Sequence, residues 1–206
     1  NREGLFYELK GAALVHTGDK KAALASYGQA ISLNPHYYSP YFQRGLLLQS
    51  MGDTEHAKAD LAASERLLPT AVASLAQGQL ALAGGDTRSA YQHFDRAQQS
   101  SGRAGDAARH ALLKLDLVKA PHKYVEARLG MNAATNRVTV EVFNLAPGGI
   151  KNIVVNVISA NGQPLPVNLR GPIAPGKTAR VETALSATSA NFNSLRIAVV
   201  RAEPVE

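Results

Sequence analysis

The sequence predicts two domains in succession, an array of helices followed by a small antiparallel β-sandwich. Composition changes near Pro121, from Ala, Leu, Gln and Ser before it to Val, Asn, Thr, Pro and Gly after it. Apolar residues recur at helical spacing in the first part and at alternate positions in the second part. The first part also repeats itself. We therefore expect a helical repeat domain over residues 1–121 and a β domain over residues 122–206.

Composition limits the classes of function. The chain has 206 residues, 45% of them hydrophobic, so it can bury one or two cores. It contains no cysteine, which excludes disulfides, thiolate metal sites and a cysteine nucleophile. No apolar run approaches the roughly 18 residues of a membrane span. The first residues lack both an initiator Met and the apolar core of a secretory signal, so we expect a processed or excised piece of a longer parent.

The net charge of +6 raises the question of a nucleic-acid partner. Lys and Arg are spread along the chain, without a basic cluster or an interleaved aromatic platform of the kind that single-strand binders use. We therefore expect a solvated, mildly basic surface and no nucleic-acid partner.

The helical part contains three copies of one pattern. The stretch GDKKAALASYGQAISLNP, ending at Pro35, aligns with GDTEHAKADLAASERLLP, ending at Pro69, and a third copy follows with one residue removed. Each copy has a Gly-Asp pair, then an alanine, then a large apolar residue four positions later. These residues are Gly18, Asp19, Ala23 and Tyr27; Gly52, Asp53, Ala57 and Leu61; Gly85, Asp86, Ala90 and Phe94. Gly11, Gly45 and Gly78 recur at the same spacing upstream.

Each copy predicts a helix, a tight turn and a second helix. The glycine takes the left-handed conformation that ends a helix, and the aspartate caps the next one. The alanine lets the paired helices approach closely, and the large residue fills the space one turn later. The pattern resembles the tetratricopeptide repeat (TPR), and the resemblance covers residues 5–100.

Two further expectations concern the end of the array. The third copy has Ser74, Gln77 and Ala81 where larger residues are usual, so we expect its first helix to pack less well. The segment DAARHALLKLDLVKA then predicts a capping helix whose apolar residues share one face. They are Ala108, Leu112, Leu115 and Val118.

The TPR resemblance implies a concave groove lined by the first helix of each copy, which in the family receives extended peptides. The expected groove residues are Leu5, Glu8, Ala12, Val15, His16, Phe42, Leu46, Gln49, Val72, Leu75, Gln79 and Leu82. The Lys, Asn and Arg set with which some family members clamp a C-terminal carboxylate is missing, so we expect no acidic tail as ligand. The alternative is that these side chains pack against a neighbouring domain.

The second half predicts six or seven short strands because apolar residues alternate with polar ones. The expected strands are YVEARLGM, RVTVEVFNLA, KNIVVNVISA, PLPVNLR, KTARVETALSA and LRIAVVRAE. Asn161-Gly162 is a turn signal between the third and fourth. Their number and spacing favour a small antiparallel sandwich. It resembles the immunoglobulin-like accessory domains of bacterial envelope proteins.

The stretch GPIAPGKT, Gly171 to Thr178, matches the phosphate-loop pattern G-x-x-x-x-G-K-[ST]. A phosphate cradle needs free backbone N–H groups and a helix that starts at the lysine. Pro172 and Pro175 remove two donors, and no Asp follows Asp116 to hold a metal. We therefore interpret APGK as a turn between strands. A nucleotide-binding enzyme remains the lesser alternative.

Other chemistry is sparse. The histidines occur without H-E-x-x-H or paired spacing, and no G-x-S-x-G is present, so we predict no catalytic residue, no metal site and no cofactor. The order GLFYELKGAAL, repeats, LLPTAVASLAQGQLAL resembles the tail of bacterial envelope zinc metalloproteases. That resemblance implies a zinc domain upstream, a substrate-presenting or regulatory role, and a periplasmic or envelope setting; a cytoplasmic one is the alternative. Our primary interpretation is a non-catalytic module that binds a protein or peptide.

Overall fold

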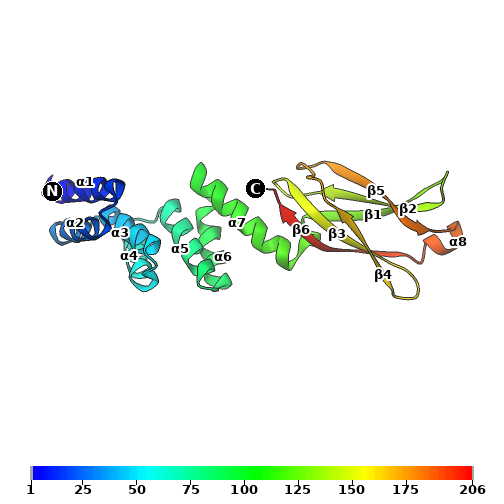
Figure 1. The fold of residues 1–206 in the computed structure, drawn as a ribbon, viewed down its shortest axis with the longest axis horizontal. Coiled ribbons are helices and arrows are strands. Elements are labelled where there is room, and N and C mark those ends of the chain that lie inside the picture. Colours follow the sequence, from blue (N-terminus) through cyan, green and yellow to red (C-terminus); the bar gives the residue numbers. More distant parts are fainter. Residues whose placement is uncertain (1, 206) are drawn as a thin grey trace. The chain divides into compact units, whose positions relative to one another are not determined.

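The computed structural model of the protein describes residues 2–205, except the side chains of residues 189 and 190. Its helices are α1 (Arg2–Thr17), α2 (Lys20–Leu33), α3 (Tyr38–Ser50), α4 (Thr54–Leu67), α5 (Ala71–Ala83), α6 (Thr87–Ala97) and α7 (Arg103–Lys119). A 3₁₀ turn, η1 (Pro121–Lys123), precedes the strands. The strands and last helix are β1 (Val125–Asn132), β2 (Arg137–Asn144), β3 (Ile150–Ile158), β4 (Pro164–Leu169), β5 (Thr178–Ser186), α8 (Ser189–Phe192) and β6 (Arg196–Pro204). Helices come first and strands second, as predicted (Figure 1).

The six helices α1–α6 form three hairpins through the predicted turns. Gly18, Gly52 and Gly85 have φ of 87°, 83° and 80°, which is the left-handed region that favours glycine. Each following aspartate caps the second helix of its hairpin. The acceptors and donors are Asp19 with Ala22 N, Asp53 with His56 N, and Asp86 with Ser89 N. The turn chemistry read from the sequence is confirmed in all three copies.

Close helix approach explains the glycine that recurs seven residues before the turn glycine in each copy. A Cβ added at Gly11 would lie 2.7 Å from Tyr27 Cε1, and one at Gly78 would lie 2.5 Å from Phe94 Cε1. At Gly45 the added Cβ would lie 2.9 Å from Leu61 Cγ. The large residue of each hairpin therefore occupies the space that the glycine leaves empty. The alanines Ala23, Ala57 and Ala90 are fully buried, as their role at the helix crossing requires.

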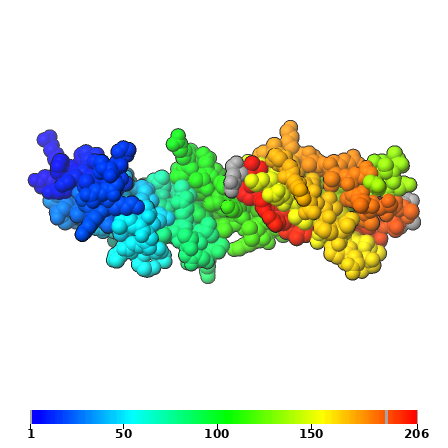
Figure 2. Space-filling view, viewed as in Figure 1, coloured from blue at the N-terminus to red at the C-terminus, as the bar shows by residue number. Residues whose placement is uncertain are grey.

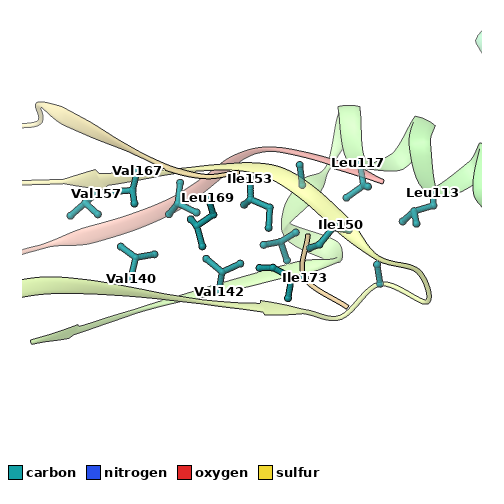
Figure 3. Close-up of a cluster of buried hydrophobic side chains, with 14 residues drawn as sticks. Leu113, Leu117, Val140, Val142, Ile150, Ile153, Val157, Val167, Leu169 and Ile173 are labelled. Carbon is teal, nitrogen blue, oxygen red and sulfur yellow. The ribbon is translucent and has the colours of Figure 1, made fainter. Parts of the chain in front are cut away.

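The strands form two three-stranded antiparallel sheets, β1-β2-β5 and β4-β3-β6. Alternate residues of β2 and β3 face one apolar core, which includes Val140, Val142, Val155 and Val157 (Figure 3). The observed strand bounds lie within two residues of the expected ones, and the Asn161-Gly162 turn joins β3 to β4. The short helix α8 has no counterpart in the sequence prediction.

The two compact units divide inside α7, after Arg109, whereas the composition change suggested a domain boundary at Pro121. The reason lies in the second half of α7. Leu113 and Leu117 are buried in the same core as the strands, so this half belongs to the β unit (Figure 3). The predicted apolar face of the helix differs accordingly, because Val118 is 80% exposed.

Candidate binding face on the first helices

The expected groove residues all lie on the first helix of a hairpin. Helix α1 carries Leu5, Glu8, Ala12, Val15 and His16; α3 carries Phe42, Leu46 and Gln49; α5 carries Val72, Leu75, Gln79 and Leu82. Each is exposed or half-buried. Helix α1 contacts α3 and α3 contacts α5, so the three helices follow one another across the unit. We call these twelve residues the first-helix face.

The exposed apolar side chains of this face are distributed over α1 and α5. Leu5 and Val72 are each 50% exposed, while Val15 and Leu82 are 41% and 40% exposed. Each of these side chains therefore has apolar surface that a ligand could contact.

The middle of the face has a second role. Phe42 and Leu46 are half-buried and pack against the cluster that contains Leu48, Leu61 and Leu80. Substitution of either would therefore disturb the core as well as the surface. The exposed positions on α1 and α5 are better probes of binding.

One carboxylate lies within the first-helix face. Glu8 Oε1 accepts a hydrogen bond from Ser39 Oγ, which links α1 to α3. Glu8 Oε2 is buried and has no hydrogen-bond partner among the described residues. The pKa of the Tyr27 phenol lies above its ordinary value, first because the ring is buried and second because the charge of Glu8 opposes ionisation. The electrostatic potential around Glu8 is therefore negative.

A polar network joins α4, α5 and α6, and sequence reasoning missed it. The Glu65 carboxylate accepts hydrogen bonds from Ser74 Oγ at 2.7 Å, Gln77 Nε2 at 2.6 Å and Arg96 Nη1 at 3.1 Å. Ser74 and Gln77 are two of the residues from which we expected weaker packing of α5. They replace apolar contacts with charge-assisted hydrogen bonds, while Ala73 is fully buried between the helices. The polar residues Ser74 and Gln77, at positions where larger residues are usual, were the sequence signal that could have indicated this network.

His93 lies beside this network and lines a depression of about 340 Å³ with Lys58, Gln77 and Asp86. Its Nδ1 is 4.0 Å from Glu65 Oε2, too far for a hydrogen bond. Burial lowers the pKa of His93, and the nearby charge of Arg96 lowers it further. The neutral imidazole is therefore favoured in the folded chain.

The stretch GPIAPGKT forms no phosphate cradle. Lys177 N donates to Ala174 O at 3.1 Å and Gly176 has φ of 67°, which is a tight turn with proline and glycine at its centre. Gly176 N is already bonded to Asn144 O at 2.9 Å. The residues after Lys177 form strand β5 in place of the required helix. The turn interpretation is confirmed.

Neither a metal cluster nor a membrane span is found within residues 2–205. No group of three or more His, Cys, Asp or Glu side chains in that range could hold a metal ion. None of the helices described there is long and apolar enough to cross a bilayer.

Comparison with known families agrees with the hairpins. The family model described as tetratricopeptide repeat matches residues 6–37 and 38–67. These residues are tetratricopeptide repeats. The matched segments correspond to α1–α2 and α3–α4, and the third copy, α5–α6, has the same turn, cap and glycine contact. No curated protein matches the sequence significantly.

Among solved structures, 156 chains match, and TPR domains recur among them. MamA is 26% identical over 47% of this chain and 57% of its own, with a TM-score of 0.46. The P58(IPK) TPR domain is 23% identical over 59% of this chain and 34% of its own, with a TM-score of 0.54. The first TPR of Spaghetti (RPAP3), bound to HSP90 peptide SRMEEVD, is 16% identical over 58% of this chain and 94% of its own, with a TM-score of 0.52. The chain thus spans about a third to just over half the length of the first two.

Identities this low establish the TPR fold and nothing further. The share of this chain that each of these matches covers is similar in size to its helical part. The immunoglobulin-like character of the β unit and the link to metalloproteases stay predictions, because no match bears on either.

Proposed function

We propose that the chain is a non-catalytic protein-interaction module whose first-helix face binds an extended, predominantly apolar peptide segment. The observation that carries this proposal is the exposure of apolar side chains at equivalent positions of the first helices α1 and α5. Leu5, Val72 and Leu82 are all at least 40% exposed. Exposed apolar side chains of this kind are a feature of interaction sites.

The charge of the face decides the class of peptide. The Spaghetti TPR domain was solved with the acidic peptide SRMEEVD. The first-helix face of this chain carries no Lys or Arg, and its one carboxylate, Glu8, would repel an acidic segment. An apolar segment without a terminal acidic cluster suits it better. The β unit would then act as a spacer or a second contact.

The test begins with phage-displayed random ten-residue peptides selected on the full chain. Selected peptides, and SRMEEVD for comparison, are then titrated by fluorescence anisotropy. We expect apolar sequences to be selected, and we expect Val72→Glu and Leu82→Glu to weaken their binding by about tenfold or more, because each puts a charge into an apolar contact. SRMEEVD should bind weakly or not at all.

Matched controls separate a site effect from a general effect of a new carboxylate. Val200 is 52% exposed on β6, and Leu68 is 44% exposed after α4, outside the first-helix face. Val200→Glu and Leu68→Glu should leave binding unchanged. The proposal is wrong if no peptide is selected, if SRMEEVD binds as tightly as the selected peptides, or if the controls lose as much affinity as Val72→Glu.

A further inference from the structure

Strand β5 is the least protected edge of the β unit. Each three-stranded sheet has two edge strands, which are β1 and β5 in one sheet and β4 and β6 in the other. Strands β1 and β6 contact each other, so these two edges lie beside one another. Strand β4 contains Pro164 and Pro166, which lack the N–H group that a further strand would need. Strand β5 contains no proline, and among the described strands it pairs with β2 alone.

The backbone of β5 has hydrogen-bonding groups on its free side. Asn144 N donates to Lys177 O at 3.0 Å, so the Lys177 carbonyl points towards β2. Backbone groups alternate in direction along an antiparallel ladder, and the pairing of β5 with β2 is regular from Thr178 to Glu182. The N–H and C=O groups of Thr178, Arg180 and Glu182 therefore point away from β2. In Figures 1 and 2, β5 (orange) runs along the border of the β unit.

The apolar side chains of β5 are less covered than those of β2. Val140 and Val142 of β2 belong to the shared core and are fully buried. Their partners on β5 are Val181 and Ala179, which pack against the same core but are only half-buried. A strand laid beside β5 would cover the remaining apolar surface of these two residues. The free side of β5 therefore offers apolar contacts as well as backbone hydrogen bonds.

Two side chains of opposite charge lie two residues apart on the solvent side of β5. Arg180 and Glu182 are both exposed, while Val181 between them packs against the core. Hydrogen bonds from Asn132 and Thr135 orient the Glu182 carboxylate and hold its pKa below the ordinary value. Glu182 is therefore ionised at neutral pH. The free edge thus carries one positive and one negative charge at fixed positions along the strand.

These charges distinguish the registers in which two copies of β5 could pair. In an antiparallel ladder, residues whose backbone groups point outward pair with each other. Arg180 opposite Arg180, or Glu182 opposite Glu182, would bring like charges together, which is destabilising. When Val181 faces Val181 instead, Arg180 of each copy lies opposite Glu182 of the other. This register gives two pairs of opposite charge and also covers both valines, so β5 is complementary to itself.

We propose that β5 pairs in antiparallel orientation with β5 of a second copy of this chain, with Val181 at the twofold axis. The sheets β1-β2-β5 of the two copies then join into one continuous sheet. Arg180 of each copy exchanges backbone hydrogen bonds with Glu182 of the other, and their side chains form an ion pair across the interface. The contact lies in the β unit and does not depend on the peptide proposed above.

A charge exchange tests the proposed register. Sedimentation equilibrium of the full chain at low salt should show a reversible monomer–dimer equilibrium. Arg180→Glu and Glu182→Arg each place like charges opposite one another twice, so each variant alone should dimerise about tenfold more weakly, or less. Mixed in equal amounts, the two variants bring opposite charges together again and should form a heterodimer about as stable as the unchanged dimer. Arg196→Glu, at an exposed position of β6, is the control and should leave dimerisation unchanged.

A disulfide detects the pairing directly. The chain has no cysteine, so Val181→Cys can form a disulfide only with a second copy. Facing residues of a non-hydrogen-bonded antiparallel pair have Cα atoms about 4.5 Å apart, which is within the range of a disulfide. We expect a covalent dimer under mild oxidation. Ala179→Cys should give much less of it, because the proposed register places Ala179 of the two copies several residues apart.

Four results would overturn the proposal. The unchanged chain could stay monomeric at every concentration tested, or the mixed charge variants could associate no better than either variant alone. Ala179→Cys could cross-link as readily as Val181→Cys, which would exclude this register. Arg196→Glu could weaken the dimer as much as Arg180→Glu does, which would place the contact outside β5.

Discussion

The helical unit and the β unit bury their apolar residues in different ways. The helical unit has separate small clusters, such as Ala23, Tyr27 and Leu47 in one place and Leu61 with its neighbours in another. The β unit has one continuous core, to which both sheets and the end of α7 contribute (Figure 3). A repeat array is stabilised mainly by nearest neighbours, whereas one shared core makes its strands interdependent. Damage should therefore stay local in the first unit and spread through the second.

Phe94→Ala should have the largest effect on the helical unit. Phe94 is 1% exposed and fills the space over Gly78, so truncation leaves a cavity in the third hairpin. We expect the free energy of unfolding to fall by about 3–5 kcal/mol. Hydrogen exchange measured by mass spectrometry should show faster exchange in α5 and α6, with α1 and α2 nearly unchanged. Equal acceleration of exchange in all six helices would contradict the expectation that damage to one hairpin stays local.

Ile153→Ala tests the opposite expectation for the β unit. Ile153 is fully buried in the shared core, so its truncation should cost about 2–5 kcal/mol. Exchange should accelerate in both sheets, including β1 and β5, which do not pair with β3. Acceleration confined to β3 and its direct neighbours β4 and β6 would show that the two sheets unfold separately.

Gly45→Ala tests the close approach of the two helices within a hairpin. The added Cβ would lie 2.9 Å from Leu61 Cγ and 3.3 Å from Asp60 Cβ, which forces the helices apart. Overpacking of this kind costs about 1–3 kcal/mol, and urea denaturation monitored by circular dichroism would measure it. Gly84→Ala is the matched control, because an added Cβ there makes only ordinary contacts at 3.5 Å or more. A stability loss for Gly84→Ala as large as that for Gly45→Ala would refute this explanation.

Asp19→Ala tests the cap of α2 in the first hairpin. The Asp19 side chain accepts a hydrogen bond from Ala22 N at 3.0 Å, and alanine leaves that donor without its partner. The expected loss is about 1 kcal/mol, seen as a lower midpoint in thermal denaturation. Asp19→Asn keeps an N-cap acceptor and should retain most of the stability. If asparagine costs as much as alanine, the hydrogen bond is not the source of the effect.

The difference between the units also explains what the sequence could reveal. Short-range patterns specify the hairpins and strands, so Gly18, Asp19, Ala23 and the alternating valines of β2 could be read directly. Such patterns do not predict contacts between segments that are distant in the sequence. Local periodicity predicts neither the Glu65 network nor the burial of Leu117 in the core of the β unit, because each depends on how separate elements pack.

The same limit applies to the candidate site. Repeat spacing predicted that the twelve residues lie on first helices, and they do lie on α1, α3 and α5. Their role in binding stays a prediction. It could not show that Phe42 and Leu46 are partly taken up by the core, or that Phe6 and Leu9 are exposed while their counterparts in α5 are buried. Exposure depends on which neighbour covers a helix, and that differs between copies with the same pattern.

The smallest expected effect concerns the pH dependence of the helical unit. The folded-state pKa of His93 lies below its ordinary value of 6.5, because burial and Arg96 both disfavour the charged ring. The unfolded chain therefore takes up the proton at a higher pH than the folded chain does. The groups that face the ring are Glu65 and Lys58 on α4, Gln77 on α5, and Arg96 and Asp86 at α6.

The direction of the pH effect follows from the order of the two pKa values of His93, the folded one lying below the unfolded one. The contribution of His93 to stability is complete above the unfolded pKa and decreases as the pH falls below about 6.5 towards the folded value. Urea midpoints measured between pH 8 and pH 5 should therefore decline less steeply for His93→Gln than for the unchanged chain. His36→Gln, at an exposed position, controls for the loss of a histidine. An identical decline for His93→Gln and the unchanged chain would place the pH dependence elsewhere in the molecule.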